Sequence, residues 1–219
     1  MSLKFELNLN KTCQSVIGLS ILLCCIPSHA RPPDCPYTTH QHLLCQADTL
    51  TLHKQLKQLL FTTNMTTNAP TRLIQDTQLL WQKRVEQCKT KRCIAQQFDA
   101  RNEDLNTYGS LNQSLTQHFI KYQQGQIAQP QVHLQVHQLD QNRIKIEGTA
   151  YRNPNNSKAK QMISFLAYRN QDQKNEIINN ETACKYTFNF QKAILTVSLL
   201  QTQPHKYCDR FVGTYQLYD

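Results

Sequence analysis

Two pairs of histidines are the first residues in this chain whose spacing could support chemistry. His133 and His137 would share one face of an extended strand, as would His40 and His42, because alternate side chains on a strand point the same way. Imidazole is a common ligand of transition metals. Most metal sites use three or four ligands, however, and neither pair has an acidic residue beside it to complete such a set. We therefore expect a solvated strand face and no bound metal.

Motifs for covalent or phosphoryl-transfer chemistry are missing from the sequence. It contains no Gly-x-Ser-x-Gly, no His-Glu-x-x-His and no glycine-rich phosphate loop, and it has only five glycines. Acid–base hydrolysis would need a pair of groups in a cleft, and no recognisable spacing indicates one. We expect a protein that is not an enzyme and that uses no cofactor.

A cluster of basic residues surrounds the end of the second predicted helix. Cations near a helix C-terminus are stabilised by the helix dipole, which favours a solvated helix end. An anion-binding patch is the alternative, with Lys89, Lys91 and Arg92 as its binding residues. Aromatic residues are not interleaved as single-strand nucleic-acid binders require, so we expect no nucleic-acid partner. The cluster consists of Lys83, Arg84, Lys89, Lys91 and Arg92.

The first thirty residues have the pattern of a secretory signal peptide. A basic start precedes an apolar stretch over residues 16–26, and the segment ends in Pro-Ser-His-Ala at Ala30. The apolar stretch is well short of the roughly 20 residues that span a bilayer. The sequence therefore predicts cleavage after Ala30 and a periplasmic or secreted product with no transmembrane segment.

The composition is that of a polar, basic protein. Mean hydropathy is −0.58, 39% of the residues are hydrophobic and 18% are charged, so much of the polarity comes from uncharged side chains. The formal net charge of +9 becomes +8 after the leader is removed, with 22 basic and 14 acidic residues. A mature chain of this charge is attracted to anionic surfaces.

Six cysteines remain in the mature chain, and we expect them to form three disulfides. An even number in an oxidising compartment favours disulfides, and the absence of any Cys-x-x-Cys pair disfavours zinc. Cys184 and Cys208 are the only cysteines in the C-terminal part, so they should pair.

The other four cysteines allow three pairings. Cys88 and Cys93 flank a short basic turn and could close it locally, which would leave Cys35 with Cys45. Antiparallel packing of the first two helices would instead bring Cys45 to Cys88. We prefer the local pairing.

The hydrophobic pattern changes period along the mature chain. Apolar residues recur at helical spacing as far as residue 122, and they alternate from residue 131 onward. Residues 123–130 are polar, with a glycine and a proline that would stop a helix. The sequence predicts an α+β protein. Its first domain (31–122) would be a disulfide-linked helical hairpin or three-helix domain, followed by a linker (123–130). The second domain (131–219) would be an antiparallel sheet of about six strands that forms a small β-sandwich or barrel.

Arg101 is a charged residue on the apolar stripe of the third predicted helix, where it must be paired, stacked or placed at the rim. We expect its guanidinium to lie over the indole of Trp81, a contact worth about 0.5–2 kcal/mol. A ligand-binding role for Arg101 is the alternative.

The helical part also carries an ordered set of residues: Cys35, Leu44, Cys45, Leu52, Gln78, Trp81, Arg84, Cys88, Cys93, Ile94, Phe98, Arg101 and Leu105. This order resembles the N-terminal domain of LprI-type lysozyme-inhibitor-like proteins of bacterial envelopes. The run from Cys184 to Tyr215 is similar, more loosely, to the β domain that follows it in some members. The resemblance implies that Trp81, Arg84 and Arg101 are structural residues of the family motif.

What the resemblance implies for function is lysozyme binding, with inhibition as a further step, in the cell envelope and without catalysis. The positive charge supports an alternative, an interaction module that binds anionic cell-wall or membrane material or another envelope protein. Basic lysozymes would be repelled by a basic chain unless a local acidic patch offsets the net charge. Salt should distinguish the two hypotheses, because it screens electrostatic attraction.

Overall fold

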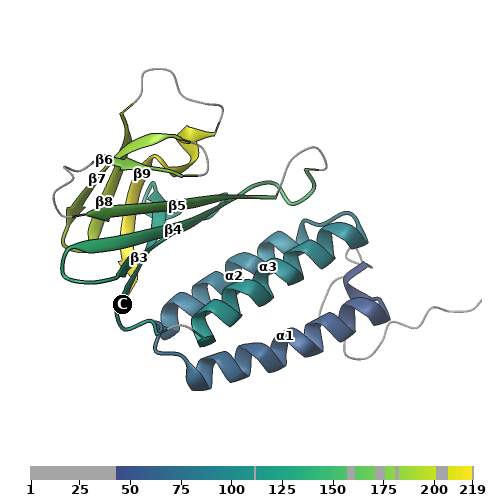
Figure 1. Ribbon diagram of the computed structural model, residues 1–219. Helices are drawn as coiled ribbons and strands as arrows, with labels where there is room; N and C mark the ends of the chain where they lie inside the picture. The colour runs from purple at the N-terminus through teal and green to yellow at the C-terminus, as the bar shows by residue number, and fades with distance from the viewer. Residues whose placement is uncertain are drawn as a thin grey trace, which may run out of the picture. The chain divides into compact units, whose positions relative to one another are not determined.

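Three helices precede an antiparallel sheet in the computed structural model (Figure 1). The structure describes residues 43–110, 112–156, 161–170, 176–180, 183–200 and 207–218, all within one compact unit that spans residues 32–219. The predicted signal peptide, Cys35, His40 and His42 lie outside the described residues. The helices are α1 (Ala47–Thr66), α2 (Thr71–Glu86) and α3 (Lys91–Ser110). The strands are β1 (Thr116–Gln123), β2 (Gln126–Ile127), β3 (Val132–Gln138), β4 (Arg143–Tyr151), β5 (Met162–Asn170), β6 (Glu176–Ile178), β7 (Lys185–Gln191), β8 (Ile194–Leu199) and β9 (Gly213–Tyr218).

Helices α2 and α3 form because their apolar residues recur every three or four positions and make one continuous buried stripe on each helix. Where the stripes meet, the rings of Trp81 and Phe98 pack edge to face with centroids 5.0 Å apart, and His53 of α1 packs on Phe98 at 4.8 Å. Helix α2 begins directly after Pro70, which has no N–H to leave unsatisfied. The predicted arrangement of three helices is confirmed.

Helix α1 is held to α3 by close polar contacts as well as by apolar burial. Thr63 is buried, and its hydroxyl donates to the Leu105 carbonyl at 3.2 Å, while the Thr67 hydroxyl donates to the Tyr108 carbonyl at 2.5 Å. Gly109 lies opposite Thr63, and a Cβ atom there would be at an ordinary contact distance of 3.7 Å from the Thr63 hydroxyl. Threonine hydroxyls at the C-terminal end of α1 thus hold this helix to the backbone of α3.

The prediction of helical structure as far as residue 122 is wrong. Helix α3 ends at Ser110, and residues 116–123 form β1. The helical spacing of Leu115, Phe119 and Tyr122 is coincidental. Neighbouring residues of a strand point to opposite faces: Phe119 is buried in the barrel core, whereas Ile120 is buried against the helices. A strand covered on both faces has no polar alternation to reveal it.

The strands form one antiparallel sheet in the order β5-β4-β3-β1-β9-β8-β7-β6, with β2 paired to β1. At its two edges the Asn180 amide donates to the Leu166 carbonyl at 2.8 Å, and the Asn179 side chain accepts from the Leu166 amide at 3.4 Å. The sheet is therefore a nearly closed barrel. The six strands predicted after residue 131 are present, and β1, β2 and β6 are additional.

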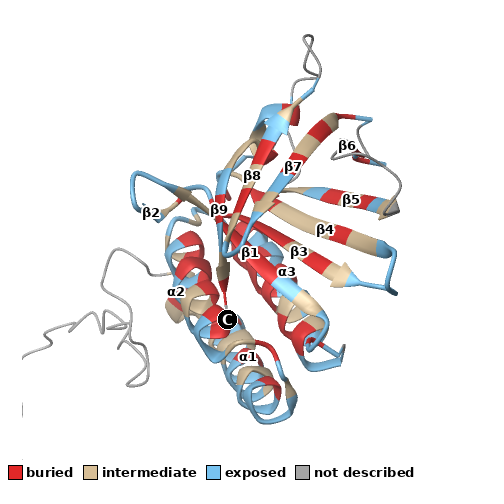
Figure 2. Ribbon diagram, turned by 90° about the vertical axis from the view of Figure 1, so that its left-hand side faces the viewer, coloured by how far each residue is buried: buried red, intermediate tan, exposed pale blue. Residues whose placement is uncertain are grey.

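Two apolar clusters result, and β1 contributes to both. The barrel interior contains Phe119, Leu134, Phe165, Phe188 and other apolar residues, and Figure 2 shows buried positions alternating with more exposed ones along its strands. The second cluster contains the helical stripes together with Ile120 and Tyr218 from the outer face of β1 and β9. Residues 123–130 include the β1–β2 turn and β2 rather than an unstructured linker. Independent folding of the two parts stays a prediction.

Both preferred disulfide pairings are confirmed. Cys88 is bonded to Cys93 across a Cα–Cα distance of 5.5 Å, and Cys184 to Cys208 across 5.8 Å. The rival bond between Cys45 and Cys88 is thereby excluded. Cys45 is also disulfide-bonded, to a residue outside the described ranges, so its predicted pairing with Cys35 stays a prediction.

Candidate anion-binding site

A pocket of about 280 Å³ lies where the last turn of α2 meets the start of β3 and the end of β4. Its charged lining residues are Lys83, Arg84 and Arg152, and no acidic residue is among those that line it. We call it the basic pocket. Its remaining lining consists of amide, proline and leucine side chains: Leu80, Gln87, Gln129, Pro130, Gln131, Asn153 and Pro154.

Arg84 is the buried cation of this pocket, with 8% of its surface exposed. Its Nε donates to the Gln97 side chain at 3.2 Å and its Nη1 to the Gln131 side chain at 2.7 Å. The guanidinium carbon lies 3.6 Å from the centre of the Tyr151 ring. Among the described residues Arg84 makes no ion pair, and its Nη2 has no hydrogen-bond partner. A buried cation is thus held in place by neutral groups alone.

Amide side chains hold Arg84 in this position. Gln97 of α3, which accepts from Arg84, donates to the Gln161 side chain at 2.5 Å, and Gln161 donates to the Pro154 carbonyl at 2.5 Å. The backbone carbonyl of Gln97 also accepts from the Trp81 indole at 2.8 Å. The guanidinium is therefore connected by hydrogen bonds both to α3 and to the loop that follows β4, and it cannot turn away without breaking them.

The other two cations reach the basic pocket from different elements. Lys83 is exposed on the last turn of α2. Arg152 follows β4, and its guanidinium carbon lies 4.2 Å from the centre of the Tyr207 ring. Burial lowers the pKa of Arg84, and the Asp104 carboxylate partly offsets this effect. Because arginine stays charged in proteins, the pocket concentrates positive charge that an anion would neutralise.

The three predicted binding residues of the basic turn do not line this pocket. Lys89 lies beside it, because the Asn155 side chain accepts from the Lys89 amide at 2.8 Å and donates to the Gln87 carbonyl at 2.7 Å. Lys91 instead approaches Asp48 at 3.4 Å, and Arg92 is exposed at the start of α3. Sequence reasoning identified Lys83 and Arg84 as part of a basic cluster, but Arg152 lies too far along the chain to have been grouped with them.

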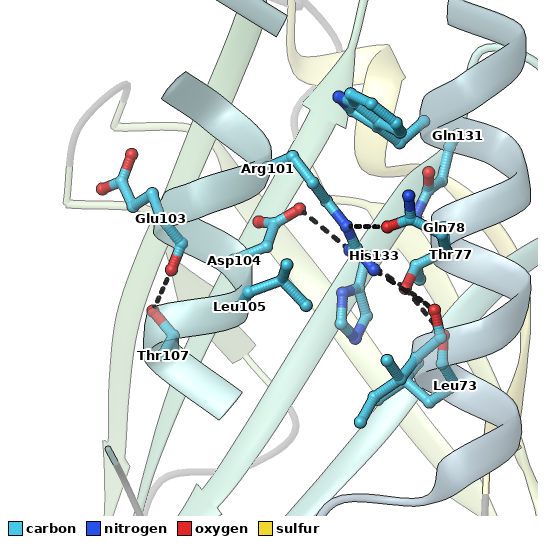
Figure 3. A network of polar contacts seen from close by, with 12 residues as sticks. Leu73, Thr77, Gln78, Arg101, Glu103, Asp104, Leu105, Thr107, Gln131 and His133 are labelled. Carbon is cyan, nitrogen blue, oxygen red and sulfur yellow. Dashed lines mark hydrogen bonds and ion pairs between the residues drawn. The ribbon is translucent and has the colours of Figure 1, made fainter. Parts of the chain in front are cut away.

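Arg101 has different partners from the predicted one (Figure 3). Its side chain donates to the Gln78 side chain at 2.9 Å, the Thr77 hydroxyl at 3.2 Å and the Ile74 carbonyl at 3.2 Å, and it lies 3.6 Å from the Asp104 carboxylate. The prediction that it stacks on Trp81 is wrong. Four oxygen acceptors satisfy a buried guanidinium better than an indole face would. Arg101 therefore has hydrogen-bonding and ion-pair partners in place of the expected aromatic one.

Asp104 connects the environments of the two buried arginines. It pairs with Arg101 and also accepts from the Tyr151 hydroxyl at 3.0 Å, and the Tyr151 ring lies beneath Arg84. Burial raises the pKa of Asp104, and the Arg101 cation opposes that shift. The Asp104 carboxylate thus pairs with Arg101, and Tyr151 alone lies between it and Arg84.

Two histidines lie at the same interface. His118 and His133 are buried on neighbouring strands, with Nδ1 and Nε2 3.2 Å apart, and His118 also contacts the Gln113 side chain at 3.0 Å. Burial lowers the pKa of His118 to about 4 and also lowers that of His133. The prediction that His133 lies on a solvated face is wrong, because helices cover this residue.

His137 is half-buried, and its Nε2 lies 3.0 Å from the Glu147 carboxylate. No group of three His, Cys, Asp or Glu residues that could hold a metal occurs in the described ranges.

A second pocket, of about 290 Å³, has the opposite charge. It is lined by Asp99 and Glu103, which are exposed one turn apart on α3, together with Gln161 and Met162 near the start of β5. We call it the acidic pocket. Gln161, which accepts from the Gln97 side chain, is part of its lining.

The fold and these pockets define a disulfide-bonded α+β protein with a basic site between helix and barrel. No family model, curated protein or solved structure matches the chain. No helix in the described part of the chain has the length and apolar character needed to cross a membrane.

Proposed function

We propose that this is an exported, non-catalytic binding protein of the bacterial envelope, and that its basic pocket holds an anionic group of the partner. The observation that carries the proposal is Arg84, a buried cation with neutral partners and one nitrogen unused among the described residues. Buried charges are ordinarily paired. An incoming carboxylate, phosphate or sulfate group would supply that pair.

The geometry is suited to holding an anion. Arg84 is already oriented by Gln97 and Gln131, so little side-chain freedom is lost when an anion binds. Lys83 and Arg152 provide further charge from two other directions. A hydrogen bond to a charged group contributes about 1.5–3 kcal/mol, enough for one such contact to decide whether a partner stays bound.

Export is supported by the pattern of the first thirty residues and by the disulfides, which form and persist in oxidising compartments. The natural ligands in such a compartment include anionic cell-wall polymers and lipid headgroups, as well as acidic surfaces of other envelope proteins.

A pair of charge-matched variants tests the site. Lys83→Gln with Arg152→Gln removes two cations from the basic pocket, and Lys54→Gln with Lys57→Gln removes two exposed cations from α1. Binding to purified cell-wall sacculi and to phosphatidylglycerol vesicles is measured by sedimentation at low and high salt. We expect the pocket variant to lose about tenfold in affinity, equivalent to 1.4 kcal/mol. Equal losses in both variants would show that only net charge matters.

Lysozyme binding is a second proposal, drawn from the resemblance. It is supported by the acidic pocket, because Asp99 and Glu103 provide the local acidic patch that a basic lysozyme would need on a basic chain. The residues of the family motif that the structure describes also gather in one region, around Trp81, Arg84 and Arg101.

A panel of animal-type, goose-type and invertebrate-type lysozymes tests this second proposal by binding and by residual lytic activity. Asp99→Asn with Glu103→Gln should weaken binding, whereas Asp48→Asn with Glu86→Gln, which removes the same charge elsewhere, should not. Absence of binding to every lysozyme in the panel would reject lysozyme as the partner and leave the anion proposal standing.

A further inference from the structure

The two ends of the barrel are filled differently. At one end, the 3-10 helix Cys208–Phe211 and the Cys184–Cys208 disulfide close the interior, with Phe211 packed on Phe165 at 5.1 Å and the Tyr186 hydroxyl donating to the Cys208 carbonyl at 2.8 Å. At the other end, where β1 and β4 begin and β3 and β5 end, the structure has a pocket of about 420 Å³. We call it the barrel-end pocket.

The inner face of the barrel changes from apolar to polar at this pocket. On β5 the inward positions run Phe165, Ala167 and then Arg169, because alternate residues share a face. On β3 the corresponding change comes at Gln138, and on β1 it comes at Gln117. In the sheet register Gln138 and Arg169 both lie beside Ile144, whereas Gln117 lies beside Val136, so polar and apolar side chains are mixed at this end of the barrel.

Two core residues supply apolar surface beside these polar side chains. Val136 of β3 and Ile144 of β4 line the pocket and belong to or pack against the barrel core. Leu115, which precedes β1, also lines it and is 59% exposed, although its carbonyl is tied to the Gln138 amide at 2.9 Å. Apolar surface combined with a few polar groups is the usual character of small-molecule sites, which also occur in the mouths of β-barrels.

The charges at the rim favour an anion. Two arginines, Arg143 and Arg169, line the pocket, against one acid, Asp140. Asp140 is 2.6 Å from Arg143 and accepts from the backbone amides of residues 142 and 143, so its charge is directed toward its own turn. Arg169 stands on the inner face of the barrel, directly opposite Ile144 in the sheet register.

We propose that the barrel-end pocket binds a small amphipathic organic anion, with its apolar chain over Val136 and Ile144 and its carboxylate at Arg169. This site is separate from the basic pocket and does not depend on the function proposed above. A medium-chain fatty acid has the required chemistry.

Decanoate is the probe, and decanol of the same chain length is its uncharged counterpart. Binding of each to the full mature chain is measured by calorimetry, and the site is located by backbone amide shifts in NMR spectra of the unaltered protein. We expect decanoate to bind more tightly than decanol and to shift the amides of Gln117, Val136 and Ile144. Absence of decanoate binding, or shifts confined to the surroundings of Arg84 and Arg152, would overturn the proposal.

Arg169→Gln should weaken decanoate binding by about tenfold and leave decanol unchanged, because only the carboxylate contact is lost. Arg92→Gln, at an exposed position on α3, is the charge-matched control and should change neither. Leu115→Asn alters an exposed rim residue and should weaken both ligands. If Arg169→Gln and Arg92→Gln had equal effects, the carboxylate would not be held at Arg169 and the proposal would fail.

Discussion

The barrel interior and the helix–sheet interface are both buried, but they are held together by different forces. The barrel interior is lined by aliphatic and aromatic side chains, as in the contact of Phe165 with Phe211. The helix–sheet interface buries Arg84, Arg101 and His133 beside its apolar residues. Burial of apolar surface depends little on geometry or pH, whereas a buried polar group is stable only while each partner is in place and in the right protonation state. We therefore expect the interface to be the part of the molecule most sensitive to single substitutions and to acid.

The largest expected effect is the loss of Arg101. Replacing it by methionine leaves the Asp104 carboxylate and the Thr77 and Gln78 acceptors without their cation, which should cost about 3–5 kcal/mol in free energy of unfolding. Urea denaturation measures it. Arg72→Met is the control, because the Arg72 side chain is 76% exposed and its pair with Asp76 should contribute about 0–1 kcal/mol.

A double variant sharpens this prediction. Arg101→Met combined with Asp104→Leu removes both charges, and much of the lost stability should return, because no uncompensated carboxylate remains at the helix–sheet interface. If Arg101→Met lost less free energy of unfolding than the Arg72→Met control, the interface would not depend on the Arg101–Asp104 pair. The contrast with the barrel would then be wrong.

The two disulfides allow the stability of the helical part and of the barrel to be compared, because each part contains one of them. Cys184 and Cys208 are 24 residues apart in sequence and Cys88 and Cys93 are five apart. A longer loop restricts the unfolded chain more, so replacing the barrel pair by alanine should cost about 2–4 kcal/mol, and replacing the helical pair should cost less. Thermal unfolding of the two double-alanine variants decides the order. A larger loss for the Cys88–Cys93 variant would contradict the loop-length argument.

Acid should weaken the interface before the barrel. Burial holds the pKa of His118 at about 4, below the ordinary histidine value of 6.5, so between these values the unfolded chain binds a proton that the folded chain does not. The free energy of unfolding is therefore not reduced by His118 above about pH 6.5, and it falls by about 1.4 kcal/mol per pH unit as the pH drops toward 4. The pH dependence of the urea midpoint tests this.

Substitution of His118 by glutamine should reduce that pH dependence but not abolish it, because burial also lowers the pKa of the neighbouring His133. His137→Gln provides the comparison: this histidine is only half-buried, and Glu147 opposes the lowering of its pKa. An unchanged acid response in His118→Gln would show that other groups control the transition.

Sequence patterns predicted the elements whose signal is local. Alternation identified β3 through Val132, Leu134 and Val136, and the short spacing of Cys88 and Cys93 favoured their pairing. Strand β1 was missed because it is covered on both faces, so Phe119 and Ile120 are adjacent buried residues that fit neither period. Strand β6 has only three residues, too few to show a period.

The candidate sites were less predictable than the fold. Arg84 belongs to a visible basic cluster, yet its pocket is completed by Gln131 and Arg152, which are brought to it by the packing of the sheet against α2. Packing also decided that Arg101 contacts Gln78, Thr77 and Asp104 and does not stack on Trp81. Helical spacing predicts on which face of the helix a side chain lies, but it does not predict which neighbouring residue the end of that side chain reaches.

By itself the sequence determined the change from helices to strands, the two confirmed disulfides and the positive charge. The change of element type and the Cys88–Cys93 bond depend on residues at short separations, the Cys184–Cys208 bond on the absence of other cysteines in the C-terminal part, and the charge on composition alone. Only the tertiary structure decided that His133 is covered, that Arg84 faces a pocket without an acidic lining residue, and that one end of the barrel is closed while the other is hollow. The physical reason is that burial and electrostatic environment are produced by groups distant in sequence, and they exist only after the helices and the sheet have packed together.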